Sequence, residues 1–209
     1  MSRACQKLHQ LCSMLPTITF PFDSGTIPKN GIYVLFETSE TAHGTNRIVR
    51  IGSHTGNGQL PSRLHQHFLN ENKDRSIFRK NIGRALLNKI QDPFLPHWNI
   101  DLTTREARAR HSKLIDFAKQ DLVEKQVTEY MRKHFSFSFI SVPNRTARLR
   151  FETKLIATVS QCQICKSSTN WLGHYSPIAL IRAGKLWQVK DLGKAPLTND
   201  EFEKLSMFA

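Results

Sequence analysis

The sequence of 209 residues has no long apolar run and few acidic residues. Its longest apolar stretch, around Gly31 to Phe36, is the length of one strand, whereas a membrane-spanning helix needs about 18 apolar residues in a row. We therefore expect no membrane-spanning role. The first nine residues also lack the apolar core of a signal peptide, so we expect a location inside the cell, cytoplasmic and nucleoid-associated when bound to DNA.

Glycine and proline are too scarce for a low-complexity chain, with 10 and 9 residues, and 39% of the residues are hydrophobic. This composition supplies a core of ordinary size and excludes wholesale disorder. The 17 acidic residues face 30 lysines and arginines, which gives a formal net charge of +13. An excess of this size favours a polyanionic partner, and without a basic amphipathic anchor the favoured partner is nucleic acid.

Cysteine is also rare, because the chain has only Cys5, Cys12, Cys162 and Cys165. The last two form a Cys-x-x-Cys pair, but a structural zinc site usually needs a second ligand pair at similarly short spacing. Neither Cys5 nor Cys12 supplies that pair. The sequence therefore predicts reduced structural thiols rather than a metal site.

The chain reads as a leader over residues 1–28 followed by one domain over residues 29–209, since no Gly/Ser-rich or Pro-rich linker divides it. Alternating β-rich segments at 31–37 and 47–52 predict a hairpin, with residues 38–46 as a long polar loop. A short helix is expected to begin at Ser62 as its N-cap.

The remaining pattern predicts an α/β (α+β) domain in which helices flank a small, mainly antiparallel sheet. Further predicted elements are helices over 76–90, 116–134 and 146–160, a strand over 135–142, an irregular stretch over 94–104 and a terminal helix opened by a capping box at Thr198 to Glu201. Residues from about 92 to 134 read as a helical insertion.

Several short motifs occur in a specific order. They are Gly31-Ile32-Tyr33, Arg50-Ile51-Gly52, Arg63-Leu-His-Gln-His67, Glu152 and Asn170-Trp-Leu-Gly173. Together they resemble the GIY-YIG nuclease superfamily, and most closely its restriction-endonuclease-type members, over about residues 29–173. The resemblance implies a divalent-metal-dependent endonuclease that hydrolyses phosphodiester bonds in double-stranded DNA.

The resemblance assigns roles to three of these residues. Tyr33 corresponds to the general base of the family, Arg63 to the arginine that contacts the scissile phosphate, and His67 to the residue one helical turn later. Positions i and i+4 share a helix face, so both side chains can reach one phosphate. A phenol with a pKa near 10 is a poor base at neutral pH, so Tyr33 needs help from its surroundings.

Glu152 corresponds to the metal-binding glutamate of the family, for which Mg²⁺ or Mn²⁺ is the expected ion. In the alternative interpretation, Glu152 is a partly exposed glutamate paired with Arg148 or Lys154. Asn170 corresponds to an asparagine near the site, although an asparagine before a tryptophan is equally typical of a turn.

Arg50 departs from the family pattern, because it stands where the second motif has its tyrosine. A guanidinium there could lower the pKa of Tyr33 or bind phosphate. The same departure leaves open a DNA-binding module whose nuclease site has decayed. A further alternative is a structure-specific repair or recombination nuclease.

Basic segments outside the site are expected to contact DNA. The candidate residues are Arg79, Lys80, Arg84, Arg105, Arg108, Arg110, Arg145, Arg148 and Arg150. For each run the alternative is a solvated helix surface. The insertion is the candidate specificity element or dimer interface. Since one chain carries one site, double-strand cleavage would need a homodimer or two successive binding events.

Overall fold

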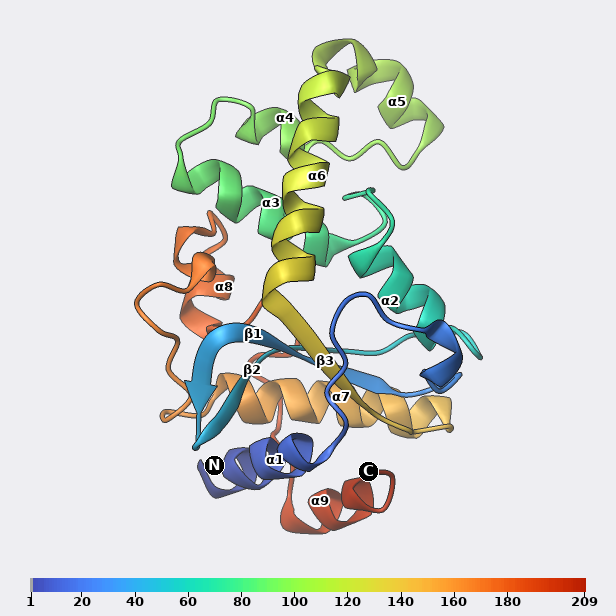
Figure 1. The fold of residues 1–209 in the computed structure, drawn as a ribbon, viewed down its shortest axis with the longest axis vertical. Helices are drawn as coiled ribbons and strands as arrows, with labels where there is room; N and C mark the ends of the chain where they lie inside the picture. Colours follow the sequence, from blue (N-terminus) through green and yellow to red (C-terminus); the bar gives the residue numbers. More distant parts are fainter. Residues whose placement is uncertain (1) are drawn as a thin grey trace.

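A three-stranded antiparallel sheet forms the centre of the computed structural model, which describes residues 2–209 (Figure 1). The strands are β1 (Ile32–Ala42), β2 (Thr45–Gly52) and β3 (Phe135–Ile140), and their order in the sheet is β2-β1-β3. Helices cover both faces of this sheet. The predicted fold class, a small antiparallel sheet flanked by helices, is confirmed.

The helices account for most of the remaining chain. They are α1 (Ser2–Met14), α2 (Leu60–Phe68), α3 (Ile77–Lys89), α4 (Leu95–Asn99), α5 (Arg105–His111), α6 (Phe117–His134), α7 (Arg145–Ser160), α8 (Ala179–Gly184) and α9 (Asn199–Ser206), with short 3-10 turns η1 (Ser24–Thr26), η2 (Ser112–Leu114) and η3 (Leu172–Tyr175). Within residues 2–209, no helix combines the length and the apolar character that crossing a bilayer requires.

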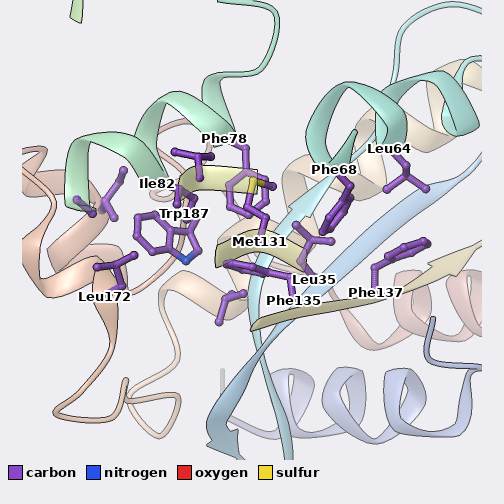
Figure 2. Packing of buried hydrophobic residues seen from close by; sticks show 14 of the residues in the cluster. Leu35, Leu64, Phe68, Phe78, Ile82, Met131, Phe135, Phe137, Leu172 and Trp187 are labelled. Atoms are coloured by element: carbon purple, nitrogen blue, oxygen red, sulfur yellow. The ribbon is translucent and has the colours of Figure 1, made fainter. Parts of the chain in front are cut away.

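The central strand β1 is buried on both faces because it separates two apolar cores. Tyr33 and Leu35 face the core built with α2, α3 and α6, part of which Figure 2 shows. Ile32, Val34 and Phe36 face the core built with α1, α7 and α9. Successive side chains of a strand alternate between its two faces. Because both faces of β1 are buried, residues 32–36 form a continuous apolar run in the sequence.

Local sequence signals, mainly N-cap residues, mark where several of the helices begin. Ser76 caps α3 by accepting the amide of Arg79, and Asp116 caps α6 in the same way. The predicted capping box of α9 is present at Thr198. The predicted N-cap at Ser62 is wrong, because α2 begins two residues earlier and carries a proline in its first turn, a position that tolerates proline.

The hairpin differs from its prediction. Strands β1 and β2 continue outward to a two-residue turn at His43 and Gly44, where φ is 53° and 77°, as in a type I′ turn. The expected long polar loop is therefore paired strand. Its polar composition arises because Thr38, Ser39 and Thr41 are exposed.

The expected leader is part of the fold rather than a separate segment. Leu8 and Cys12 of α1 are fully buried, and Ile18 forms a β-bridge with Phe137. The segment predicted as an insertion contains α4, α5 and α6, so the predicted irregular stretch at 94–104 includes one short helix. Helix α6 packs into the core and leads directly into β3, while α5 lies at the far end of the molecule (Figure 1).

Candidate active site

A chain of hydrogen bonds joins the first strand to two helices. The Tyr33 hydroxyl lies 2.8 Å from Nε2 of His67, and Nδ1 of His67 lies 2.7 Å from Oγ of Ser76. Ser76 Oγ also accepts the amide of Arg79 as the N-cap of α3. When Nδ1 carries the proton and donates it to Ser76, Nε2 of His67 accepts the Tyr33 hydroxyl. The sequence-predicted pair Tyr33 and His67 is thus brought together.

Gly52 makes room for Tyr33. The two residues are directly paired across β1 and β2, so their side chains lie on the same face. A Cβ at position 52 would overlap the hydroxyl oxygen and Cζ of Tyr33. The glycine of the second motif is therefore required by the placement of the tyrosine of the first.

His67 is fully buried, and this burial lowers its pKa well below 6.5. The positive charges of Arg63, Arg50 and Arg79 lower the pKa further. The imidazole is consequently neutral at neutral pH and retains a lone pair that can accept a proton.

Arg63 lies one turn before His67 on α2 and lines a cavity of about 360 Å³. Its Nη1 donates to Oε1 of Gln66 at 2.9 Å and to the carbonyl of Arg75 at 3.2 Å. The guanidinium is partly exposed. Ser53 and His54, which follow the second motif, line the same cavity.

Glu152 on α7 receives a hydrogen bond from the Ser53 hydroxyl. The pairing with Arg148 or Lys154 does not form, because Arg148 donates to backbone carbonyls and Lys154 pairs with Glu201. Burial raises the pKa of Glu152, while Ser53 and the charge of Arg50 partly oppose that rise. Glu152 is therefore a desolvated carboxylate.

Arg50 lies on the same sheet face as Tyr33, where it pairs with Leu35 across the hairpin. Its Nη1 donates to the carbonyl of Trp187 at 2.5 Å, its guanidinium carbon lies 5.0 Å from the centre of the Phe78 ring, and its buried Nε has no hydrogen-bond partner. It shares a cavity of about 200 Å³ with Glu152. Since its charge lowers the pKa values of both His67 and Glu152, Arg50 links the two halves of the site.

Two residues that sequence reasoning missed line the cavity of Glu152. Asn81 of α3 is buried there, and Asp191 contributes a second carboxylate whose charge raises the pKa of Glu152. Hard oxygen donors of this kind suit Mg²⁺ or Mn²⁺, so Glu152 and Asp191 fit a divalent ion. No short-range motif could have identified Asp191, because it lies far along the chain from Glu152.

The structure does not bring Asn170 to this group. Asn170 is exposed in the turn before Trp171, and the neighbouring Ser168 bonds to Glu40 in the outer part of β1. Trp171 is buried and donates its indole N–H to Glu37. The position therefore matches the alternative interpretation, a turn residue that directs the tryptophan into the core.

Several predicted DNA contacts also take other roles. Arg79 is fully buried and its guanidinium binds Glu124 at 2.7 Å, while Lys80 is buried in an ion pair with Asp74 at 3.2 Å. Arg148 is buried with its guanidinium on the carbonyls of His54, Val142 and Pro143. A buried, fully engaged cation does not reach a phosphate, so we remove Arg79, Lys80 and Arg148 from the predicted DNA-contacting set.

The remaining predicted cations divide by exposure. Arg84 is half-buried and donates to Asn99 and Asn81. The exposed residues are Arg105, Arg108 and Arg110 on α5 and Arg145 and Arg150 on α7. Of the predicted DNA-contacting residues, these are the exposed ones, although Arg150 also pairs with Glu201 at 2.6 Å.

A phenol on a neutral imidazole, a desolvated carboxylate and neighbouring guanidiniums are the parts that phosphodiester cleavage requires. The fold and this site define a nuclease domain. The sequence profile of the GIY-YIG domain matches residues 17–206, and the chain belongs to the GIY-YIG family, whose nucleases generally use divalent metals. No curated protein matches the chain, and no solved structure matches it.

Proposed function

We propose that the protein is a divalent-metal-dependent endonuclease that cleaves double-stranded DNA in the manner of restriction enzymes. The observation that carries this proposal is the 2.8 Å contact between the Tyr33 hydroxyl and neutral His67. Arg50 stands close enough to influence both His67 and Glu152 electrostatically. The site thus combines proton transfer, charge neutralisation and metal ligation in one place.

Proton transfer would run through Tyr33 and His67. The Tyr33 oxygen takes a proton from the water that attacks phosphorus as its own proton passes to His67 Nε2. Because the pKa of His67 is lowered well below 6.5, the imidazole then releases that proton to solvent. The bond from phosphorus to the departing O3′ breaks, and that oxygen gains a proton from solvent. Ser76 keeps the imidazole oriented by holding Nδ1.

Glu152 would be the principal metal ligand, with Asp191 as a second carboxylate and Mg²⁺ or Mn²⁺ as the ion. Such an ion, when bound, neutralises charge on the phosphate and on the departing oxygen. Arg63 would hold the scissile phosphate from its open cavity. Arg50, whose Nε has no partner, would add a second positive charge beside it.

DNA binding is assigned to the exposed arginines of α5 and to Arg145 and Arg150 on α7. Phosphate contacts of this kind supply affinity without sequence information. Helix α5 belongs to the insertion, which we propose as the specificity element. Its neighbours Leu114, Phe117 and Leu122 are exposed apolar side chains, which favours a homodimer contact in the same region.

Two alternative functions predict different results in DNA-binding and cleavage assays. A structure-specific repair or recombination nuclease would use the same site but prefer branched DNA. A decayed DNA-binding module would bind without cutting. The retention of Tyr33, Arg63, His67 and Glu152 together argues against decay.

The test is a digest of plasmid and phage DNA with Mg²⁺, with Mn²⁺ and with chelator, beside branched and modified substrates and a gel-shift assay. Discrete, metal-dependent bands on linear duplex are expected. Cleavage confined to branched DNA would replace the restriction role with the repair alternative. Equal binding with and without metal, and no cutting of any substrate, would establish the decayed module.

A further inference from the structure

Four buried or half-buried sulfur and imidazole groups meet at the outer part of the hairpin, where the proposed nuclease chemistry uses none of them. Cys5 and His9 come from α1, His43 from the turn between β1 and β2, and Cys165 from the segment after α7. One ligand atom from each lies within 4.8 Å of all the others. Three segments that are distant in sequence therefore converge on one point.

The individual distances fit a tetrahedral metal site. Cys5 Sγ lies 3.3 Å from Cys165 Sγ, and Cys165 Sγ lies 3.8 Å from Nε2 of His9. Zinc bonds of about 2.3 Å to sulfur and about 2.0 Å to nitrogen separate two tetrahedral sulfurs by about 3.8 Å and a sulfur from a nitrogen by about 3.5 Å. Both observed separations lie within about 0.5 Å of these values. We propose that Cys5, His9, His43 and Cys165 bind Zn²⁺ as a structural site.

His9 already has the support that a zinc ligand needs. Its Nδ1 lies 2.9 Å from the carbonyl oxygen of Cys5, and a hydrogen bond there fixes the tautomer in which Nε2 carries the lone pair that a metal would bind. Nε2 accepts the amide of Ile48 at 3.2 Å. Zinc would take the place of that hydrogen bond, so ligation requires a local shift between α1 and β2.

His43 occupies a turn position that favours other residues. Its φ of 53° is left-handed, and the first position of such a turn is usually asparagine, aspartate or glycine. The imidazole of His43 lies with its centre 5.0 Å from that of His9. A histidine at this left-handed position fits a metal-binding role, because strained positions tend to carry function.

The thiols are reduced in the structure and have no other assigned role. Cys5 and Cys165 are free, and their 3.3 Å separation exceeds the roughly 2.05 Å length of a disulfide bond. Cys162 Sγ lies 3.5 Å from Nε2 of His43, which makes it the neighbouring thiol to test. Zinc would tie α1 to the hairpin and to the segment after α7, and this role is independent of the nuclease proposal.

The first test measures metal in the untagged full chain, purified with reductant and without chelator, by elemental analysis and native mass spectrometry. We expect about one zinc per chain. Cys5→Ser and Cys165→Ser should lose it, whereas Cys12→Ser should keep it. Cys12 is the matched control because it is a buried thiol on the same helix but outside the cluster.

A second measurement keeps the proposal testable if a cysteine variant does not fold. Chelator-treated wild type is loaded with Co²⁺, and the visible bands of tetrahedral cobalt with thiolate charge transfer are recorded. His43→Asn tolerates the positive φ and should weaken cobalt binding at least tenfold while the secondary structure persists. Cys162→Ser and Tyr33→Phe should bind cobalt as wild type does.

Four results would overturn the proposal. They are a wild type without zinc, zinc retained in both Cys5→Ser and Cys165→Ser, a Cys5–Cys165 disulfide in the non-reduced protein, or zinc lost from Cys162→Ser but kept in Cys165→Ser. None of these outcomes depends on DNA cleavage. Failure of the zinc site is therefore distinguishable from failure of the nuclease assignment.

Discussion

The Tyr33 hydroxyl and Nε2 of His67 lie 2.8 Å apart in a buried pair that joins β1 to α2. The pair places a phenol beside an imidazole that burial and three nearby arginines keep neutral. Together they form a proton acceptor next to the arginines.

Tyr33→Phe removes the hydroxyl and leaves the ring in place. Cleavage should fall by about 10²- to 10⁴-fold, the usual contribution of a general base, while DNA affinity stays within about twofold. His67→Gln should cause a similar loss. The double variant should cost no more than either single change, because both act in one proton path. Single-turnover cleavage rates test this, and additive losses would contradict the shared path.

Gly52→Ala places a Cβ against the Tyr33 hydroxyl. Overpacking of this kind should destabilise the protein by about 1 to 3 kcal/mol and reduce cleavage by about 10²-fold by displacing the phenol. Gly193→Ala is the matched control, since nothing lies within 4 Å of the point that its Cβ would occupy. Urea unfolding and cleavage assays on both variants test this prediction. Equal stability and equal cleavage rates in Gly52→Ala and Gly193→Ala would refute the close contact between position 52 and the Tyr33 hydroxyl.

Arg50 should set the acid limit of activity. Its positive charge lowers the pKa of His67 and that of Glu152, so removing the charge raises both. Each group then becomes protonated at a higher pH, and the acid limb of the cleavage profile moves upward in Arg50→Met. Arg50→Lys keeps the charge and should shift the limb less. Unchanged profiles in both variants would remove Arg50 from the electrostatics of the site.

The sequence predicted the elements whose signals are local. Ser76 before α3, Asp116 before α6 and the alternating phenylalanines of β3 mark their boundaries directly. The order of the five short motifs from Gly31 to Gly173 likewise indicates the GIY-YIG family, which the domain match over residues 17–206 confirms.

The sequence could not predict which cations are buried. Arg79 looks like any surface arginine until Glu124, from a helix 45 residues away, is placed beside it. Asp191 and Ser53 join Glu152 only through tertiary contacts. Asn170 matched a motif by type and order, but its turn lies toward the outer part of the hairpin.

The arginines of α5 should control the salt dependence of DNA binding. Changing Arg105, Arg108 and Arg110 together to alanine should reduce the slope of log K against log salt by about 2 to 3, because each lost phosphate contact removes about one released ion. A triple change of the exposed Arg3, Lys194 and Lys204 removes the same charge from other surfaces. Fluorescence anisotropy at several salt concentrations measures DNA binding by the two triple variants. Equal slopes of log K against log salt in both variants would exclude α5 from the DNA-contacting surface.

The most direct test of the nuclease assignment compares Glu152→Gln with Glu129→Gln in a Mg²⁺-dependent plasmid digest. Glu129 is an exposed glutamate on α6 and controls for the loss of one negative charge. Glu129→Gln should cut at the wild-type rate, whereas Glu152→Gln should bind DNA and lose cleavage by at least about 10²-fold. Wild-type cleavage by Glu152→Gln would contradict the account, because the site would then lack its principal metal ligand and still function.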